Sequence, residues 1–467
     1  MSAVVCVDFG STFTKAVLVN RTSGELLATA SHPTTLPDAT GAGDVLDGYD
    51  ACVAALAEQD PRAVDADVLA CSSAGGGLRI AVVGNEELVT AEAGRRVALS
   101  SGGKVVLVLH GGLDDTKLAE LRAAEPDVVL LVGGTDGGNA EVLEGDARFL
   151  AGQPWPGPVV VAGNVESQHL VTELLTGSGT PHVLAGNVVP RIGVLAPDSA
   201  RRAIREIFLS HVIGGKHLSS RTDGRGRTFT SMVRGATPDV VLTGVELLAR
   251  GLDDQRGAGD VVVVDVGGAT TDVHSVVELD PEDSGLAREV VATTPVTRTV
   301  EGDLGMRWSA VSTVEAAGRD DLHAAAVRRR ERPDLLPDSC PDPVAEQDAD
   351  LDIAAAAVRI ALERHAGRSK VVVSPEGRVV ERSGKDLREV DLLVGSGGVL
   401  RHGGPDAVRR VLVPATGDAF EGGWQLPRDP RVVVDHDYVL AAAGLLAQEH
   451  PVAAHRLLGG LRAAGDR

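Results

Sequence analysis

Two segments of this sequence place an acid, glycines and small hydroxyl residues in the same order. The first is Asp8-Phe9-Gly10-Ser11-Thr12-Phe13-Thr14-Lys15 and the second is Asp265-Val266-Gly267-Gly268-Ala269-Thr270-Thr271-Asp272, each directly after an apolar run. Glycine and hydroxyl residues let backbone N–H groups and side-chain oxygens approach phosphate, and the acid before them can hold a hydrated Mg²⁺. Either segment alone is ordinary hairpin-turn composition. Because the pattern occurs twice, it predicts a clamp for phosphate groups.

A third glycine-rich segment, Leu392 to Leu400, is predicted to be a buried strand followed by Gly395-Ser396-Gly397-Gly398 and a helix. Such a turn lets the backbone pass close to a base and ribose, and it starts a helix whose N-terminal dipole favours anions. Competing nucleotide signatures do not fit. Gly214-Gly215-Lys216-His217 lacks the spacing and the hydroxyl of a P-loop, and Gly10-Ser11-Thr12 is not a dinucleotide fingerprint.

The residues around the two acidic loops predict the strands that position them. Short apolar runs are separated by turns that leave no room for helices, which is typical of antiparallel meanders. The first meander is predicted at Val4–Val7, Lys15–Asn20 and Glu25–Ser31, and the second at Val261–Asp265, Thr271–Val277 and a third strand near Glu289–Thr293. Two similar meanders indicate two like-folded lobes.

Between the meanders, short apolar runs lead repeatedly into glycine turns, at Val105–Leu109, Val128–Val132, Val159–Ala162 and His182–Ala185. This pattern predicts consecutive βα units of a small parallel sheet. We therefore expect an α/β fold with residues 1–103 as a first lobe, 104–195 as an inserted βα module, 196–257 as a helical connection and 258–467 as a second lobe with an irregular excursion at 316–350. Helices are expected at Leu351–His365 and near Tyr438–Leu446. The pattern leaves open whether the module docks a partner or only stabilises the fold, although docking is favoured.

The composition limits the classes of partner. The chain has 467 residues and a net charge of −21, from 45 Lys+Arg and 66 Asp+Glu, with only 2% aromatic residues. Nucleic acids and anionic membranes are polyanions that such a surface repels, and few aromatic rings are available to stack on bases. The four scattered cysteines form no disulfide framework or metal motif, and the sequence contains no recognisable signal peptide or membrane-spanning run. We therefore expect a cytoplasmic protein that binds neither nucleic acid nor membrane.

In this order, the three glycine-rich segments resemble the phosphate 1, phosphate 2 and adenosine motifs of the superfamily of actin, sugar kinases and seventy-kilodalton heat-shock chaperones. The resemblance covers most of residues 3–31 and 258–450 and implies two ribonuclease-H-like lobes that close on Mg-ATP. Three further segments narrow the resemblance to one family within the superfamily. They are Thr299-Val300-Glu301-Gly302-Asp303-Leu304-Gly305, Gly133-Gly134-Thr135-Asp136-Gly137-Gly138 and Gly163-Asn164-Val165-Glu166. With Val264 to Ser275, they resemble the glutamate mutase accessory (reactivatase-like) family over nearly the whole chain.

The resemblance to the superfamily implies a role for each motif residue. Asp8 and Asp265 would be the catalytic and metal-binding residues, holding Mg²⁺ through water, with one of them orienting the attacking water. The lobes would grip the β- and γ-phosphates through Gly10, Ser11, Thr12 and Lys15 on one side and Gly267, Gly268, Thr270 and Thr271 on the other. Adenosine would be bracketed by Gly395, Ser396, Gly397 and Gly398. Asp272, Glu301 and Asp303 are expected close to the nucleotide.

The family resemblance implies an ATPase, with ATP and Mg²⁺ as cofactors, that services an adenosylcobalamin-dependent mutase of the glutamate mutase or aminomutase type. ATP hydrolysis would drive the exchange of damaged cobalamin, and the partners would be the mutase subunits, with a homo-oligomer also open. Two alternatives remain: a small-molecule kinase of the same superfamily and a non-hydrolysing actin-like scaffold. A sugar kinase needs a catalytic acid beside residues that bind the sugar. Trp155, Trp308 and Trp424 do not lie next to an obvious cleft acid in the sequence.

Overall fold

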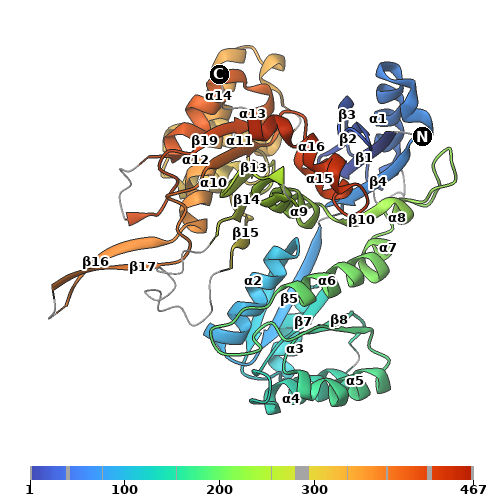
Figure 1. The fold of residues 1–467 in the computed structure, drawn as a ribbon, viewed down its shortest axis with the longest axis vertical. Coiled ribbons are helices and arrows are strands. Elements are labelled where there is room, and N and C mark those ends of the chain that lie inside the picture. The colour runs from blue at the N-terminus through green and yellow to red at the C-terminus, as the bar shows by residue number, and fades with distance from the viewer. Residues whose placement is uncertain are drawn as a thin grey trace. The chain divides into compact units, whose positions relative to one another are not determined.

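The computed structural model describes residues 3–37, 43–75, 77–153, 155–253, 255–278, 294–333, 335–374, 377–417 and 423–463. The chain divides into two compact units. Unit 1 comprises the described residues of Met1–Thr243, Glu289–Thr294 and Gly444–Ala453, and unit 2 those of Gly244–Arg288, Pro295–Ala443 and Ala454–Arg467. Figure 1 labels the helices and strands of both units.

Unit 1 contains a sheet centred on the N-terminal strand. Its strands are β1 (Ala3–Phe9), β2 (Phe13–Asn20), β3 (Leu26–Pro33), β4 (Asp67–Ser72) and β10 (Val233–Ala236), in the spatial order β10-β4-β1-β2-β3. The first three strands form an antiparallel meander, and β4 and β10 continue the sheet in parallel on the other side of β1. Helix α1 (Val45–Gln59) packs on this sheet. Asp44 starts the helix because its side chain accepts the Leu46 N–H, at 2.9 Å.

Unit 2 contains a second sheet with the same connectivity. Its strands are β13 (Val261–Val266), β14 (Thr271–Val276), β15 (Val296–Glu301), β18 (Leu392–Ser396) and β19 (Arg431–Val434), in the order β15-β14-β13-β18-β19. Again the first three strands are antiparallel and the last two continue in parallel beside the first. The four valines that open β13 are buried on both faces, as expected of a central strand.

The repeated topology confirms the predicted α/β fold with two ribonuclease-H-like sheets. Both predicted meanders are present. The third strand of the second meander lies at Val296–Glu301, and the segment Glu289–Thr293, where it was expected, is outside the described residues. Four of the insert's strands are found as predicted, within a third sheet.

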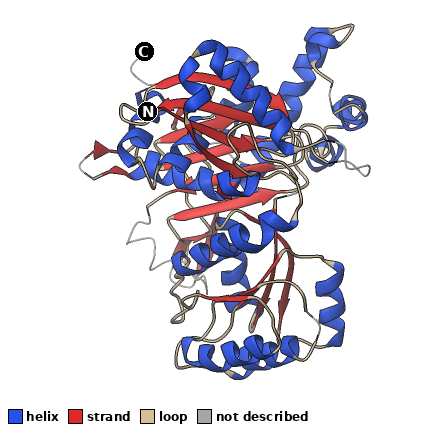
Figure 2. Ribbon diagram, turned by 90° about the vertical axis from the view of Figure 1, so that its right-hand side faces the viewer, coloured by secondary structure: helices blue, strands red, loops and turns tan. Residues whose placement is uncertain are grey.

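This third sheet is entirely parallel and belongs to unit 1. Its strands are β5 (Leu78–Gly84), β6 (Gly103–His110), β7 (Val128–Leu131), β8 (Val159–Val161) and β9 (His182–Leu184), in the order β6-β5-β7-β8-β9. Helices α3 (Asp115–Ala123), α4 (Glu141–Ala151) and α5 (Gln168–Gly177) pack on one face. Helices α2 (Glu92–Ser100) and α6 (Asp198–Ile207) cover the other face. Figure 2 shows this helix–sheet–helix module in its lower half.

Two strands that the sequence analysis does not predict lie outside the residue ranges expected to form their sheets. β5 precedes residue 104, so it falls in the predicted first lobe, yet it is a central strand of the third sheet. β10 falls in the predicted helical connection 196–257, yet it is the outer strand of the first sheet. A short apolar strand carries no mark of which sheet it joins, because only its pairing partners decide that. The division into lobes and insert remains our proposal, with the insert beginning near β5.

The remaining helices and strands complete the two units. In chain order they are α7 (Ile213–Gly215), α8 (Phe229–Met232), α9 (Thr237–Arg250), β11 (Gly251–Leu252), β12 (Gln255–Arg256), α10 (Ala310–Ala316), α11 (His323–Glu331), α12 (Pro343–His365), β16 (Arg368–Ser374), β17 (Gly377–Ser383), α13 (Gly398–His402), α14 (Gly404–Ala407), α15 (Val439–Leu446), α16 (Pro451–Leu457) and α17 (Gly459–Ala463). The helix expected near Tyr438–Leu446 is therefore present as α15, and the one expected at Leu351–His365 begins earlier, at Pro343. None of the described helices is both long and apolar enough to cross a membrane.

The excursion 316–350 is more ordered than its sequence suggests. It contains α11 and the start of α12, held together by Arg329, whose side chain is 2% exposed. Arg329 contacts Asp350 at 2.6 Å and Glu346 at 3.0 Å, and Arg307 contacts the same Asp350 at 3.0 Å. A buried guanidinium requires such partners because an unpaired charge in the interior is costly. Arg329, in the run Arg328-Arg329-Arg330, thus has a structural role.

Candidate functional site

The acid of the first motif, Asp8, lies near the carboxyl end of β1 and is held from several sides. In the sheet it is paired with Lys15 of β2 and Cys71 of β4. The hydroxyl of Thr237, just after β10, donates to Asp8 Oδ1 at 2.6 Å, and Lys15 Nζ lies 3.7 Å from Asp8 Oδ2. The Cys71 thiol also lies 3.6 Å from Oδ1. The carboxylate therefore has a fixed orientation at the centre of the sheet.

The loop after Asp8 is a tight hairpin turn. Gly10 N–H donates to the Phe13 carbonyl at 3.2 Å, and a β-carbon at Gly10 would lie 2.6 Å from the same oxygen, so only glycine fits. Thr34 braces the loop from the end of β3: its hydroxyl donates to Gly10 O at 2.9 Å and its N–H to Thr12 O at 2.9 Å. Ser11 is exposed at the tip. The turn is thus pre-shaped, with its hydroxyl side chains available to an anion.

Asp265 of β13 occupies the corresponding position in unit 2. Its loop closes in the same way, because Gly267 N–H donates to the Thr270 carbonyl at 2.9 Å. The residue opposite the acid differs, however: it is Lys15 in unit 1 and Asp272 in unit 2. Arg298 Nη2 donates to Asp272 Oδ1 at 3.2 Å, but burial raises the pKa of Asp272. The first loop therefore carries a cation that the second lacks.

The second loop is covered from behind by the segment that follows β15. Met306 N–H donates to Gly267 O at 3.0 Å and Arg307 N–H to Gly268 O at 2.8 Å. A β-carbon at Gly268 would lie 2.8 Å from the Trp308 ring, so any other residue there would have to displace this ring. No pattern in the sequence predicts this contact of Trp308. Thr270 is partly exposed, whereas the Thr271 hydroxyl is fully buried and has no hydrogen-bond partner among the described residues. Thr271 thus does not present its hydroxyl at the surface of this structure.

The third motif lies directly beside the second within unit 2. β18 runs parallel to β13, with Ser396 next to Asp265. Gly397 has φ +106°, and a β-carbon there would overlap the Val266 carbonyl oxygen, whereas Gly398 has no atom nearby that a β-carbon would meet. Gly395 is closely packed too, because a β-carbon would lie 2.6 Å from Leu412. The predicted phosphate and adenosine segments of this unit are therefore brought together.

Glu301 and Asp303 are held by an arginine from α12. Arg364 Nη1 donates to Glu301 Oε2 at 2.7 Å and to Asp303 Oδ1 at 2.7 Å, and Arg364 Nη2 donates to Asp303 Oδ2 at 2.9 Å. Hydrogen bonding to Arg364 lowers the pKa of Asp303. Glu301 lies opposite Thr271 at the end of β15, so this pair stands at the edge of the second loop. Both acids are thus already paired with Arg364.

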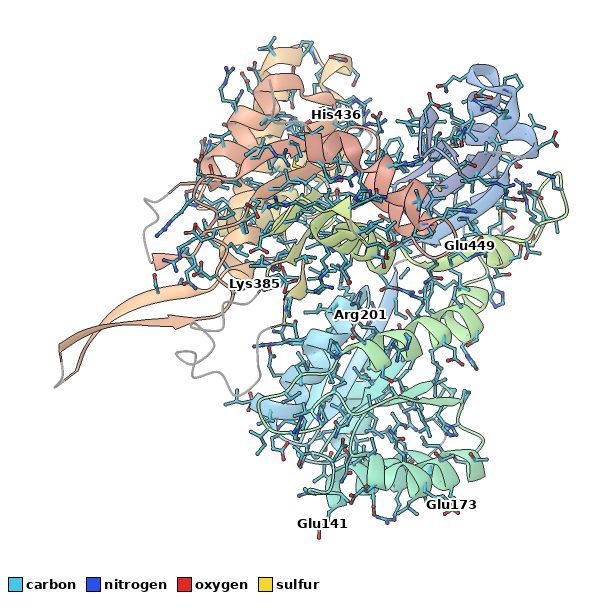
Figure 3. All side chains as sticks on the ribbon, in the orientation of Figure 1. Glu141, Glu173, Arg201, Lys385, His436 and Glu449 are labelled. Carbon is cyan, nitrogen blue, oxygen red and sulfur yellow. The ribbon has the colours of Figure 1, made fainter. Side chains whose placement is uncertain are left out.

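Sequence reasoning gave no role to Asp435, which follows β19. Its N–H donates to Gly395 O at 2.9 Å, and its carboxylate accepts the N–H groups of Val439 and Leu440 at 2.9 and 3.1 Å, which starts α15. Burial raises the pKa of Asp435 to about 6, with Asp437 and Asp265 contributing. His436, labelled in Figure 3, is the next residue and is exposed. An acid shortly before a predicted helix was the available signal.

This raised pKa predicts how stability depends on pH. The acid group favours its neutral form in the folded protein, so its stabilising contribution is complete below the ordinary pKa and is lost as pH rises through about 6. Relative to Asp435→Asn, we expect the wild type to lose ~2–3 kcal/mol of unfolding free energy between pH 4 and pH 7. Urea unfolding of both proteins across this range measures the difference. A constant difference would contradict the assignment.

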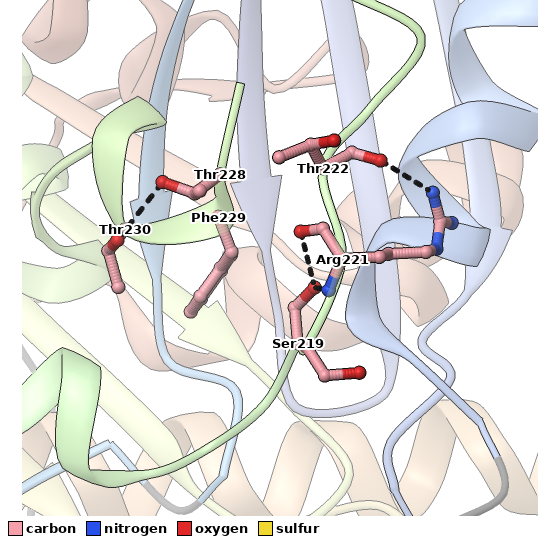
Figure 4. Close-up of a pocket in the computed structure, with 7 residues that line it drawn as sticks. Ser219, Arg221, Thr222, Thr228, Phe229 and Thr230 are labelled. Atoms are coloured by element: carbon pink, nitrogen blue, oxygen red, sulfur yellow. Dashed lines mark hydrogen bonds between the residues drawn. The ribbon is translucent and has the colours of Figure 1, made fainter. Parts of the chain in front are cut away.

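A pocket lies elsewhere in unit 1 (Figure 4). It has a volume of about 520 Å³ and is lined by Ser219, Ser220, Arg221, Thr222, Thr228, Phe229 and Thr230. The Phe229 ring packs edge-on against that of Phe9, with centroids 5.0 Å apart, next to Asp8 in the chain. Arg221 is already paired with Asp47 and Asp50, at 2.8 Å each. The pocket includes none of the residues predicted to bind nucleotide.

The motif residues suit Mg-ATP in the fixed shape of their turns and in their carboxylates. A β-carbon at Gly10, Gly268 or Gly397 would meet the chain's own atoms, so these glycines let the turns close tightly on the chain itself. Within the described ranges, no three acidic, histidine or cysteine side chains gather as a metal cluster. Magnesium does not need such a cage, because it keeps several waters and uses one or two carboxylates with the substrate phosphates. Asp8 and Asp265 provide carboxylates of that kind, one in each unit.

Comparison with known proteins agrees with the motif resemblance. The model of the MutL protein family matches residues 4–460. The chain belongs to this family. Protein MutL of Clostridium tetanomorphum is 35% identical over 473 residues, which cover 98% of each chain. Membership confirms the resemblance to the glutamate mutase accessory family.

Similarity to solved structures is much weaker. Nucleotide-free acetone carboxylase is 14% identical, with a TM-score of 0.39 over 95% of this chain and 70% of that chain. The ethanolamine utilization protein EutJ from Carboxydothermus hydrogenoformans is 9% identical, with a TM-score of 0.27 over 95% of this chain and 88% of that chain. The description of the fold therefore rests on the strand order and pairing of the sheets.

Proposed function

We propose that this protein is a cytoplasmic ATPase that serves an adenosylcobalamin-dependent mutase of the glutamate mutase or aminomutase type. The observation that supports it most directly is the repeated hairpin. Asp8 and Asp265 stand at the same position of two sheets with the same topology, each two residues before a glycine that closes the turn. Membership of the MutL protein family supports the choice of mutase, since the resemblance that implies this client is to that family.

The residues of each unit have distinct tasks in this proposal. Mg²⁺, when bound, neutralises charge on the β- and γ-phosphates. Asp8 and Asp265 would hold its water ligands, and one of them would orient the attacking water. The water oxygen bonds to the γ-phosphorus as the bond to the bridging oxygen breaks, ADP leaves and the water's proton ends on the released phosphate. Lys15 supplies a positive charge, while the remaining donors come from backbone N–H groups and hydroxyls. Positioning and charge neutralisation are the main requirements of phosphoryl transfer.

Hydrolysis would change how the protein grips the mutase, so that damaged cobalamin leaves and intact cofactor enters. The test uses a purified mutase inactivated by loss of its adenosyl group. Adding this protein, Mg-ATP and free adenosylcobalamin is expected to restore mutase turnover, whereas a non-hydrolysable ATP analogue is not. Phosphate release with candidate small molecules separates the alternatives, because a kinase would form ADP only with its substrate and a scaffold would form none. Failure to restore any mutase while ATP is hydrolysed would sink the proposal.

A further inference from the structure

The inserted module of unit 1 has an edge at which the loops that follow its strands lie together. All five of its strands are parallel, so their carboxyl ends lie along one edge of the sheet. The order β6-β5-β7-β8-β9 is that of a doubly wound sheet whose connections reverse direction between β5 and β7. In such sheets, binding residues gather on the loops at the carboxyl edge. We call the loops after β5, β7, β8 and β9 the carboxyl edge of the module.

The loops of the carboxyl edge are held in a fixed shape by two buried asparagines. Asn187 Nδ2 donates to Gly134 O at 3.0 Å and to Asp136 Oδ1 at 2.8 Å. Asn164 Nδ2 donates to Gly138 O at 3.4 Å. The same Asp136 Oδ1 accepts the Val165 N–H at 3.2 Å, and the Asp136 N–H donates to Pro190 O at 3.1 Å. Three loops are thereby joined into one surface, which reduces the entropy cost of ordering it on binding.

Large apolar side chains are exposed on this surface. Ile192 is 79% exposed and Leu88 69%, and Val165 and Val194 are also classed as exposed. Single exposed aliphatic residues are common and require no explanation. Here the four exposed side chains come from the loops after β5, β8 and β9. The loops after β8 and β9 are joined through Asp136 and its neighbours. Exposed aliphatic side chains on pre-ordered loops are typical of a surface that another protein covers.

The charges around these apolar residues indicate the kind of partner. Exposed acids on the edge include Glu86, Glu87, Asp136, Glu141 and Glu166. Glu141, at the start of α4, projects from the module in Figure 3. Arg191 is an exposed cation on the edge. Lys117, after β6, is a further cation, but its Nζ is engaged by the carbonyl oxygens of His110 and Gly112, at 2.7 and 2.6 Å. The loops of the edge therefore carry exposed acids together with the exposed apolar side chains.

We propose that the carboxyl edge of the module docks a protein partner that presents apolar and basic side chains. A second copy of this chain fits poorly, because its net charge of −21 would meet the same acids. Nucleic acid and anionic membrane are repelled for the same reason. This inference rests on the proposed function, under which the partner is a subunit of the adenosylcobalamin-dependent mutase.

The test measures binding of the full-length protein to immobilised, purified mutase subunits from the same genome. The double variant Ile192→Glu/Val194→Glu is expected to weaken binding at least about tenfold, because it replaces two exposed apolar contacts of the proposed interface with charges that a buried contact cannot accommodate. Val64→Glu is the matched control: Val64 is 54% exposed in the same unit but away from this edge, and its affinity should stay within about twofold of wild type. Glu166→Lys should slow association, and the effect should shrink at high salt. Melting temperatures confirm that the variants are folded.

Each outcome separates this inference from the proposed function. If the wild type binds the mutase and the double variant binds equally well, the edge is not the docking surface, although the mutase role stands. If the wild type binds no mutase subunit, the proposed function fails and this inference fails with it. If sedimentation shows that the double variant abolishes self-association instead, the occupant is a second copy and the inference is overturned.

Discussion

Asp8→Asn and Asp265→Asn are each expected to lower kcat for ATP hydrolysis by ~10²–10⁴-fold, with the fold intact. Asparagine keeps an oxygen that can accept the Thr237 hydroxyl, so the local geometry around position 8 should survive. What is lost is the negative charge that holds hydrated Mg²⁺ and orients water. In unit 2, the substitution also relieves Asp435 and Asp272 of a neighbouring charge. Phosphate release at saturating ATP measures the effect.

The control for this pair is Glu25→Gln. Glu25 is an exposed acid at the turn between β2 and β3, at the opposite end of the same sheet. Its removal changes the net charge equally and should leave kcat unchanged. Full activity in both aspartate variants would contradict the assignment of the two hairpins as the catalytic loops. Loss of activity together with a lower melting temperature would instead indicate a structural role.

The parts of the site that could be predicted are those built from contiguous sequence. Each hairpin is a strand, a turn and a strand within about eight residues, so the acid and the glycine that closes the turn are fixed locally. The hairpins therefore lie at the predicted positions, with the acids Asp8 and Asp265 two residues before Gly10 and Gly267. The two meanders followed from the same local signal.

The parts that escaped prediction depend on pairing between distant segments. Thr237 holds Asp8 although the two are 229 residues apart, because β10 is the outer strand of the first sheet. Arg364 reaches Glu301 and Asp303 only because α12 packs beside the end of β15. Asp435 meets Gly395 through the pairing of β18 and β19. No local pattern in one sequence reports such contacts.

Gly397 has a backbone conformation that other residues rarely adopt. We expect Gly397→Ala to have a large effect on both stability and nucleotide binding. Its φ of +106° with ψ of 158° is a region that residues other than glycine almost never adopt. A β-carbon there would also overlap the carbonyl oxygen of Val266, immediately before the loop of Gly267. We expect a loss of at least ~2 kcal/mol in unfolding free energy. Nucleotide affinity should fall at least about tenfold, because the turn is displaced.

Gly398→Ala is the matched control, one residue further on. Gly398 begins α13 and a β-carbon there would meet no atom within 4 Å, so alanine should be tolerated and even favour the helix. The two variants add the same methyl group to adjacent positions, and only the first forces the strand and the second loop apart. Thermal unfolding and titration with a fluorescent ATP analogue measure both effects. If the two variants behave alike, the close approach of Gly397 to Val266 does not shape the nucleotide site; if only Gly397→Ala loses stability and nucleotide affinity, the site depends on this close approach.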